Sequence, residues 1–190
     1  MTSVPGSPTD RLLTAFLVLA PLTYLVADIL YAARGWDDAT AGVVHVLAAT
    51  AYALVVLRVV TWTEGRLAAV LLLTGVVGAA GNVAYGFNTI HVSLGDTDLV
   101  DAAGAASLIK PYGLLFPLSL LLAAFALRRR ADARVVGLVA LAAVAWPVAH
   151  VGNVAWLAVA VNLALLAGFA ALAAQERSEA REPGTPVARP

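Results

Sequence analysis

The chain has 190 residues, of which 61% are hydrophobic and 13% are charged, whereas an average soluble domain has roughly 45–50% apolar and about 25% charged residues. This difference excludes an ordinary soluble protein and favours one that lies in lipid. A formal net charge of zero argues against a nucleic-acid partner, because phosphate binding needs a basic surface, and the absence of cysteine excludes disulfides, thiolate catalysis and thiolate metal ligands.

Charge-free apolar runs follow one another along the chain, and several are long enough to cross the hydrocarbon core of a bilayer, which takes about 20 helical residues. They predict an all-α fold, a polytopic membrane bundle of six transmembrane helices. In chain order, the helices are expected at residues 11–33, 41–61, 67–90, 103–127, 135–149 and 153–174. We expect one transmembrane domain over residues 11–175, preceded by a disordered N-terminus at 1–10 and followed by a disordered cytoplasmic tail at 176–190.

Two of these helices carry patterns that indicate how they pack. Tyr24, Asp28 and Tyr31 fall on one face of the first helix, which makes that face polar in its second half. In the third helix, Gly75 lies four residues before Ala79, the spacing of small residues that lets helix backbones approach closely in lipid. The third helix is therefore expected to be central and tightly packed.

The last apolar stretch, residues 135–175, is too long for one span. It contains no charged side chain, apart from a possible charge on His150. As a single helix it would be about 60 Å long, twice the roughly 30 Å of a hydrocarbon core. It is therefore expected to fold as a hairpin, with its turn at residues 147–153.

Basic residues are distributed unevenly over the loops that six spans would create. Six spans place both termini on one side of the membrane, and all but two of the 12 basic residues fall on that side. The other side has Arg34, with Lys110 just inside its edge. Because basic loops stay in the cytoplasm, this bias predicts a multi-pass protein of the plasma membrane with both termini cytoplasmic.

Polar side chains that are costly in lipid gather in the outer half of this arrangement. The inner half keeps mainly Thr50, Thr74, Ser119 and Asn162. This one-sided polarity predicts a water-filled pocket that opens outward and binds a small molecule, so that the chain would be a transport or sensing component. The candidate ligand-binding residues are Asp28, His45, Asn82, Asn88, His91, Lys110, Tyr112, His150 and Asn153.

Asp28 and Lys110 are the two strongest charges inside the expected spans. An unpaired charge at that depth costs several kcal/mol, so such groups face the bundle interior and pair. A salt bridge that joins the first helix to the fourth is therefore expected. A ligand contact or a proton relay is the alternative, and Lys110 could also extend to the outer interface.

The three histidines, His45, His91 and His150, are all expected on the outer side. Three imidazoles can hold zinc with an open fourth position, and two on facing helices can hold haem iron. Because no two of them are four residues apart, histidines that hydrogen-bond helix ends are the simpler interpretation, and we expect neither a metal nor a cofactor. The alternative function is an intramembrane enzyme or redox protein with a His-ligated zinc or haem, and the sequence names no catalytic residue.

The expected partners are the lipid bilayer and a small-molecule ligand, with a homo-oligomer as a further option and no nucleic acid. In architecture, the chain resembles the substrate-binding S-components of energy-coupling-factor vitamin transporters, which are similar in length and have six helices, both termini inside and a pocket open to the outside. That resemblance implies small-molecule binding. The first loop is shorter than in that family and the AxxxA motif of its first helix is missing, so no residue role is carried over.

Overall fold

The computed structural model describes residues 6–181, with side chains to Ser178. These residues form six α-helices and one short 3₁₀ helix, without a strand, which confirms the all-α prediction. Each of six segments is long and apolar enough to cross a membrane, as expected of a multi-pass membrane protein. The elements are α1 (Pro8–Arg34), α2 (Ala39–Thr61), α3 (Gly65–Ser93), η1 (Gly104–Leu108), α4 (Ile109–Leu127), α5 (Ala133–Val151) and α6 (Ala155–Arg181).

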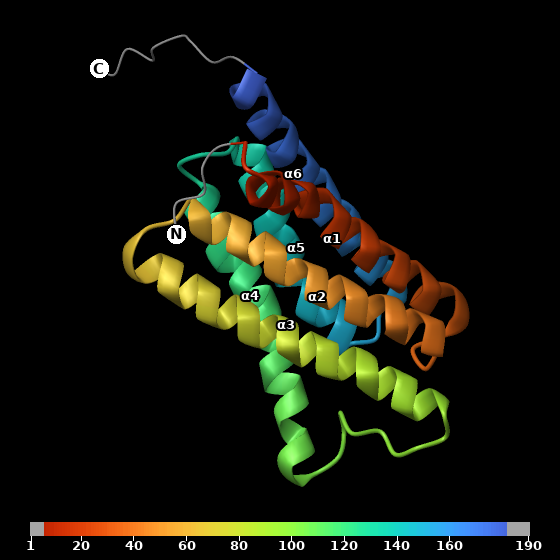
Figure 1. Cartoon of the computed structure of the whole chain (residues 1–190). Coiled ribbons are helices and arrows are strands. Elements are labelled where there is room, and N and C mark those ends of the chain that lie inside the picture. The colour runs from red at the N-terminus through yellow and green to blue at the C-terminus, as the bar shows by residue number, and fades with distance from the viewer. Residues whose placement is uncertain (1–5, 182–190) are drawn as a thin grey trace.

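The six helices form a closed ring. Each helix packs against its neighbours in the chain, and α6 returns to pack against α1. Figure 1 shows that the first turn of α1 and the last turn of α6 lie at the same end of the bundle, and that the α3–α4 connection with η1 lies at the opposite end. We call these the terminal end and the pocket end.

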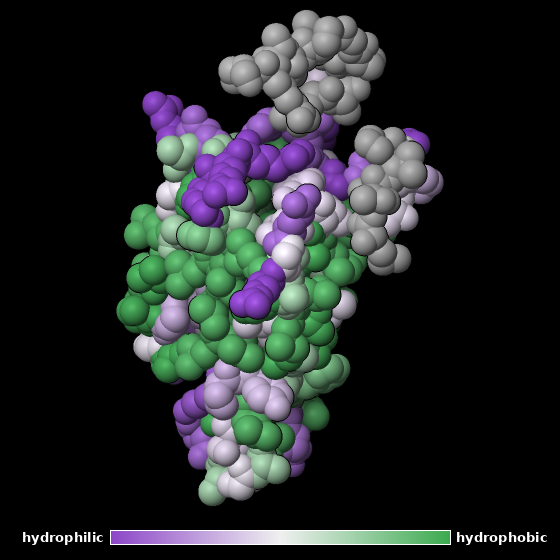
Figure 2. All heavy atoms as spheres, turned by 90° about the vertical axis from the view of Figure 1, so that its left-hand side faces the viewer, coloured by the Kyte–Doolittle hydropathy of each residue, from purple (hydrophilic) through white to green (hydrophobic). Residues whose placement is uncertain are grey.

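The outside of the bundle is apolar. Large hydrophobic side chains are exposed along its length, among them Leu73, Phe87 and Leu141. On the face that Figure 2 shows, hydrophobic side chains dominate the middle and hydrophilic ones gather toward the two ends. This distribution suits a protein whose middle is surrounded by lipid.

Helices α3 and α4 approach each other closely because α3 has glycine at the contact. A Cβ atom on Gly78 would lie 2.3 Å from the backbone nitrogen of Phe116, and one on Gly81 would lie 2.3 Å from that of Gly113. No larger residue fits at either position without moving α4. The expectation of a tightly packed third helix is confirmed, and this contact forms one wall of the cavity described below.

The terminal end holds an ion cluster that connects three helices. Arg58 of α2 is 5% exposed and binds Asp10 of α1 and Glu176 of α6. Arg130, in the α4–α5 turn, binds Glu176 as well, and its guanidinium lies 4.7 Å from the ring centre of Trp62. Asp10 and Glu176 lie in segments that the sequence predicted to be disordered, and the sequence did not predict that these residues meet.

This cluster explains why α1 and α6 are longer than predicted. α1 begins at Pro8, where the Ser7 side chain accepts a hydrogen bond from the Asp10 amide, so residues 8–10 are helical rather than disordered. α6 continues to Arg181, into the segment predicted to be a disordered tail. Residues 1–5 and 182–190, the other parts of the two segments predicted to be disordered, lie outside the described residues.

The hairpin between α5 and α6 is present, but its turn is shorter than predicted. Pro147 lies inside α5, which continues to Val151. The turn is made by residues 152–154, and Asn153 has a positive φ of 54°, a conformation that asparagine adopts more readily than most residues. The turn is joined to the α1–α2 connection, because Trp36 Nε1 donates to the Asn153 carbonyl oxygen at 3.3 Å.

Candidate functional site

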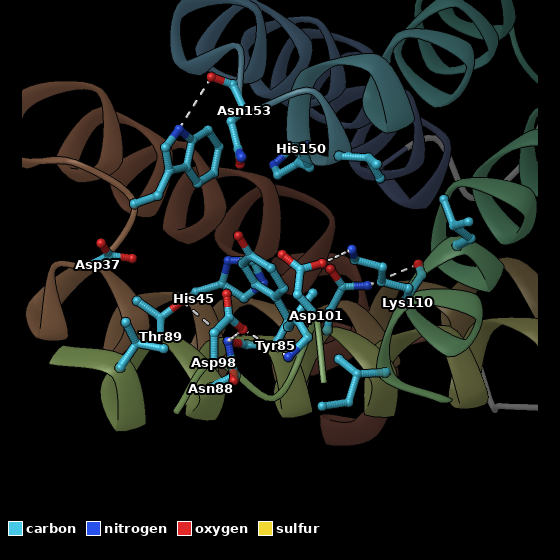
Figure 3. A pocket seen from close by; sticks show the side chains of 18 of the residues that line it. Asp37, His45, Tyr85, Asn88, Thr89, Asp98, Asp101, Lys110, His150 and Asn153 are labelled. Atoms are coloured by element: carbon cyan, nitrogen blue, oxygen red, sulfur yellow. Dashed lines mark hydrogen bonds and ion pairs between the residues drawn. The ribbon is translucent and has the colours of Figure 1, made fainter. Parts of the chain in front are cut away.

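A cavity of about 180 Å³ lies at the pocket end, between α2, α3, α4 and α5 and beneath the α3–α4 connection. Figure 3 shows His150 and Asn153 on one side of it, facing Tyr85, Asn88 and Asp98 on the other. Six of the nine residues predicted from the sequence line the cavity: His45, Asn82, Asn88, Lys110, His150 and Asn153.

The other three predicted residues do not line it. Asp28 is fully buried beneath the cavity and reaches it only through His150. His91 lies in the last turn of α3, where its Nδ1 is 3.3 Å from a carboxylate oxygen of Asp96. Tyr112 is 45% exposed on α4. The structure therefore gives His91 and Tyr112 no part in the cavity wall.

The floor of the cavity contains a hydrogen-bond chain in which each proton can be placed. The Asn82 side-chain nitrogen donates to the carbonyl oxygens of Gly78 at 2.9 Å and Gly113 at 3.3 Å. Its Oδ1 is therefore the atom that faces Tyr24, whose hydroxyl donates to it at 2.9 Å. Because a hydroxyl has one proton to donate, the Tyr24 oxygen must accept from His45 Nε2, 3.0 Å away.

This chain places a proton on Nε2 of His45. If Nε2 carries the proton, the neutral ring presents Nδ1 as an acceptor lone pair. His45 is fully buried, and its Nδ1 has no hydrogen-bond partner in the protein. Trp146, also in the cavity wall, likewise has an Nε1–H without a partner. Most buried polar atoms in proteins are paired. These two atoms belong to residues of the cavity wall, unlike the other two buried side-chain atoms without a partner in the described part of the chain, the Tyr52 hydroxyl and Asn162 Oδ1.

A second buried chain connects α1, α5 and α6. Asp28 accepts a hydrogen bond from the Asn162 side-chain nitrogen at 2.6 Å, and its other oxygen is 3.3 Å from His150 Nε2. His150 Nδ1 is 3.2 Å from the carbonyl oxygen of Trp146, one turn earlier on α5. The Trp146 and His150 rings stack with centroids 4.1 Å apart. The exposed fractions of Asp28, His150 and Asn162 are 0%, 6% and 1%.

The predicted salt bridge between Asp28 and Lys110 is wrong. The backbone neighbours of α1 are α2 and α6, whereas Lys110 is in the first turn of α4. Lys110 is half-exposed at the rim of the cavity and pairs with Asp101 of the α3–α4 connection, as Figure 3 shows. Asp28 instead finds donors on α5 and α6.

The rim of the cavity is acidic. Asp37, Asp98 and Asp101 line it together with one cation, Lys110. Asn88 holds the connection in place, because its side-chain nitrogen donates to Asp98 at 2.9 Å and its Oδ1 accepts from the Leu99 amide at 2.7 Å. The role that the structure shows for Asn88 is therefore to fold the loop over the cavity.

The histidines do not converge. Among the residues that the structure describes, no three His, Cys, Asp or Glu side chains form a group that could hold a metal ion. His45 and His150 both have Nε2 directed at a protein partner, Tyr24 and Asp28 respectively. This arrangement fits hydrogen bonding better than the zinc or haem alternative.

Sequence reasoning missed two members of the site. Asn162 was assigned to the inner half, yet it lies beside Asp28 because α6 starts at the pocket end and Asn162 is in its third turn. Trp146 is not among the residues predicted from the sequence. Its position four residues before His150, on the same helix face, was the signal that could have placed it in the cavity wall.

Comparisons with known proteins found no match to a family model, a curated protein or a solved structure. They give no support to the resemblance to the vitamin-transporter S-components. The function proposed below rests on the site alone.

Proposed function

We propose that this protein lies in the plasma membrane with both termini cytoplasmic and binds a small organic cation with N–H donors, such as a primary amine, in the cavity. It would act as a transport or sensing component. The observation that carries this proposal is the unpartnered acceptor at His45 Nδ1 in a fully buried part of the wall. An ammonium group has only donors, so it can satisfy that acceptor, whereas a carboxylate cannot and would pair only with the Trp146 Nε1–H.

Charge supports the same class of ligand. Three carboxylates and one ammonium line the rim, and His45 is neutral because its ring is fully buried and has no acceptor for a second proton on Nδ1. The excess of negative charge raises the local concentration of cations. The cavity also presents the rings of Trp36, Tyr85 and Trp146, and aromatic faces attract ammonium groups.

Volume limits the size of the ligand. A cavity of about 150 Å³ accommodates benzene, and this one is about 180 Å³. The ligand is therefore about the size of one aromatic ring with a short polar arm.

The side of the membrane follows from the charges at the two ends. Arg128, Arg129 and Arg130 belong to the terminal end, and that end is cytoplasmic if basic loops stay inside. The cavity then opens to the outside. This orientation can be tested directly because the chain has no cysteine of its own.

For this test, Val92→Cys in the cavity wall and Ser178→Cys on α6 are each exposed to a membrane-impermeant maleimide on intact cells. We expect Val92→Cys to react and Ser178→Cys to react only after permeabilisation. Labelling of Ser178→Cys alone on intact cells would reverse the orientation and exclude an outward pocket.

Ligand class is tested by thermal unfolding of the detergent-purified protein with benzylamine and cyclohexylamine, and with benzoate and cyclohexanecarboxylate as anions of matched size. At about one hundred times Kd, a ligand that binds only the folded state adds about 2.7 kcal/mol, which raises Tm by several degrees in a chain of this size. We expect this increase with the amines and not with the carboxylates.

Two substitutions assign the effect to the site. His45→Phe keeps a ring but removes the acceptor, and Asp37→Asn removes one rim charge; both should reduce the amine effect, His45→Phe more. Asp96→Asn is the matched control, because Asp96 is an acid at the same end of the bundle, in the connection that contains Asp98 and Asp101, but does not line the cavity. Equal stabilisation by the carboxylates, or an undiminished amine effect in His45→Phe, would disprove the cation proposal.

The metal alternative is tested on the same sample. An absorbance scan and metal analysis that found a haem band or stoichiometric zinc, lost in His45→Phe or His150→Phe, would replace the amine proposal with the redox or enzyme one.

A further inference from the structure

The Asp28–His150 pair is not explained by ligand binding alone, because Asp28 does not reach the cavity. We propose that the pair holds one exchangeable proton, which leaves when an organic cation enters the cavity and returns when the cation leaves. The ligand class rests on the proposed function; the shared proton rests on the pair itself.

The geometry requires a proton between the two side chains. A backbone carbonyl can only accept, so His150 Nδ1 must carry a proton toward the Trp146 oxygen. Nε2 faces Asp28 Oδ1 at 3.3 Å, and two lone pairs cannot face each other at a stabilising contact. One proton therefore lies between them, either on the imidazolium with Asp28 ionised or on the Asp28 carboxyl with His150 neutral.

Both arrangements have no net charge, which makes them compatible with a buried site. Loss of the shared proton leaves one uncompensated negative charge at a carboxylate with no exposed area, and only Asn162 then donates to it. A positive charge in the neighbouring cavity compensates that loss. Entry of one monovalent cation and departure of one proton keep the buried region neutral.

The proton has a route to the cavity. His150 lines the cavity whereas Asp28 does not, so His150 is the member of the pair that can pass the proton to water there. The step balances. The N–H bond of His150 or the O–H bond of Asp28 breaks, the proton leaves to solvent, and the bonding electrons stay on the nitrogen or oxygen atom that held the proton. No other reactant is needed.

The surrounding groups do not provide the missing charge. His45 on α2 is fully buried and has no acceptor for a proton on Nδ1, so its ring is neutral. The phenols that interact with Asp28 are neutral at physiological pH, and α6 contributes the amide of Asn162. Lys110 on α4 is at the rim and paired with Asp101. The phenols are Tyr24, Tyr31, Tyr52 and Tyr85.

The first experiment needs no ligand. In protein labelled with ¹⁵N-histidine, the three histidines are followed by NMR across pH, with His150→Gln to assign the His150 signals. We expect His150 to be protonated at Nδ1 and to share its Nε2 proton, and we expect the pH transition of Nε2 to disappear in Asp28→Asn, whose amide donates without titrating. An unchanged transition in Asp28→Asn overturns the proposal.

The second experiment measures coupling. Benzylamine is mixed with weakly buffered protein containing a pH indicator, and we expect about one proton released per bound amine in the wild type and in His91→Gln, the matched control outside the cavity. His150→Gln keeps a donor toward Asp28, so it serves if Asp28→Asn does not fold; because His150 also lines the cavity, the readout is the number of protons released per amine bound, which should fall well below one. Amine affinity should fall about tenfold per pH unit on the acid side in the wild type only.

The two proposals fail separately. Amine binding without proton release in the wild type overturns the exchange and leaves the cation site. A His150 transition that depends on Asp28, in a protein that no amine stabilises, supports the shared proton and overturns the ligand class.

Discussion

The two ends of the bundle both contain buried charged or polar groups, but these groups are paired at the terminal end, whereas two atoms at the pocket end have no partner. At the terminal end, Arg58 and Arg130 meet Asp10 and Glu176, so two cations face two carboxylates, and Thr14 adds a hydrogen bond to Glu176. At the pocket end, His45 Nδ1 and Trp146 Nε1 are buried without partners. A satisfied cluster indicates a structural role, and unsatisfied atoms beside a cavity indicate a place for a ligand.

This comparison predicts opposite effects of substitution. At the terminal end, removal of one partner leaves its counterparts buried and unpaired, so stability should fall while ligand binding is kept. At the pocket end, removal of an atom that has no partner should cost little stability and should change binding instead.

The largest expected effect is that of Arg58→Leu. Removing one partner of a buried ion pair costs about 3–5 kcal/mol, because the carboxylates of Asp10 and Glu176 then stay buried without their main cation. Unfolding of the purified protein, followed by heat or denaturant, measures the loss. Arg66→Leu, an exposed arginine in the first turn of α3, is the control and should be nearly neutral. A similar loss in both variants would contradict a structural role for the cluster.

The next largest loss of stability is expected for Gly81→Ala. The added Cβ would lie 2.3 Å from the Gly113 nitrogen and 2.4 Å from the Tyr112 carbonyl carbon, so α4 must move away from α3. Overpacking costs about 1–3 kcal/mol, and contact with backbone places this case at the upper end of that range. The free energy of unfolding measures it.

Gly137→Ala is the matched control for Gly81→Ala. It adds the same methyl group to α5, where nothing lies within 4 Å of the new atom. We expect no loss there and a gain of up to about 1 kcal/mol from helix propensity. Equal effects of the two substitutions would show that α3 and α4 are not in close contact.

The smallest effects on stability are expected for two tyrosine substitutions, which compare a hydrogen-bonded hydroxyl group with one that has no partner. Tyr24→Phe removes a hydroxyl bonded to both His45 and Asn82 and should cost about 1–2 kcal/mol. Tyr52→Phe removes a buried hydroxyl that has no partner, so it should be neutral or slightly stabilising. Both tyrosines are fully buried, and unfolding measurements compare them on equal terms. A larger loss in Tyr52→Phe would contradict the assignment of the hydrogen bonds.

Part of the site was predictable because it follows from position along a helix. His45 and Asn82 fall in the outer halves of apolar spans, and Asn153 falls in the turn between two spans, so their approach to the pocket end follows from topology. The partner of Asp28 was not predictable in this way. Lys110 and His150 are both near that end, and neither is on a helix that packs directly against α1. The choice between them depends on which side chain points into the middle of the ring: His150 is buried there, whereas Lys110 is half-exposed at the rim.

His91 shows the limit of topology as a predictor. It is at the correct end, but its position in the last turn of α3 directs it to Asp96 rather than to the cavity. That a residue lies at the pocket end does not determine whether its side chain faces the cavity. That direction depends on how the helix is rotated in the ring.

The number of spans, their approximate bounds and the end at which the polar groups gather were determined by the sequence itself, because hydrophobicity and charge act over short stretches of chain. The pairing of Asp28 with His150 and Asn162, the ion cluster around Arg58 and the unpartnered nitrogen of His45 were decided only by the tertiary structure. These contacts join residues more than one hundred positions apart or depend on such packing. Their physical origin is the closure of α6 onto α1, which no local pattern contains.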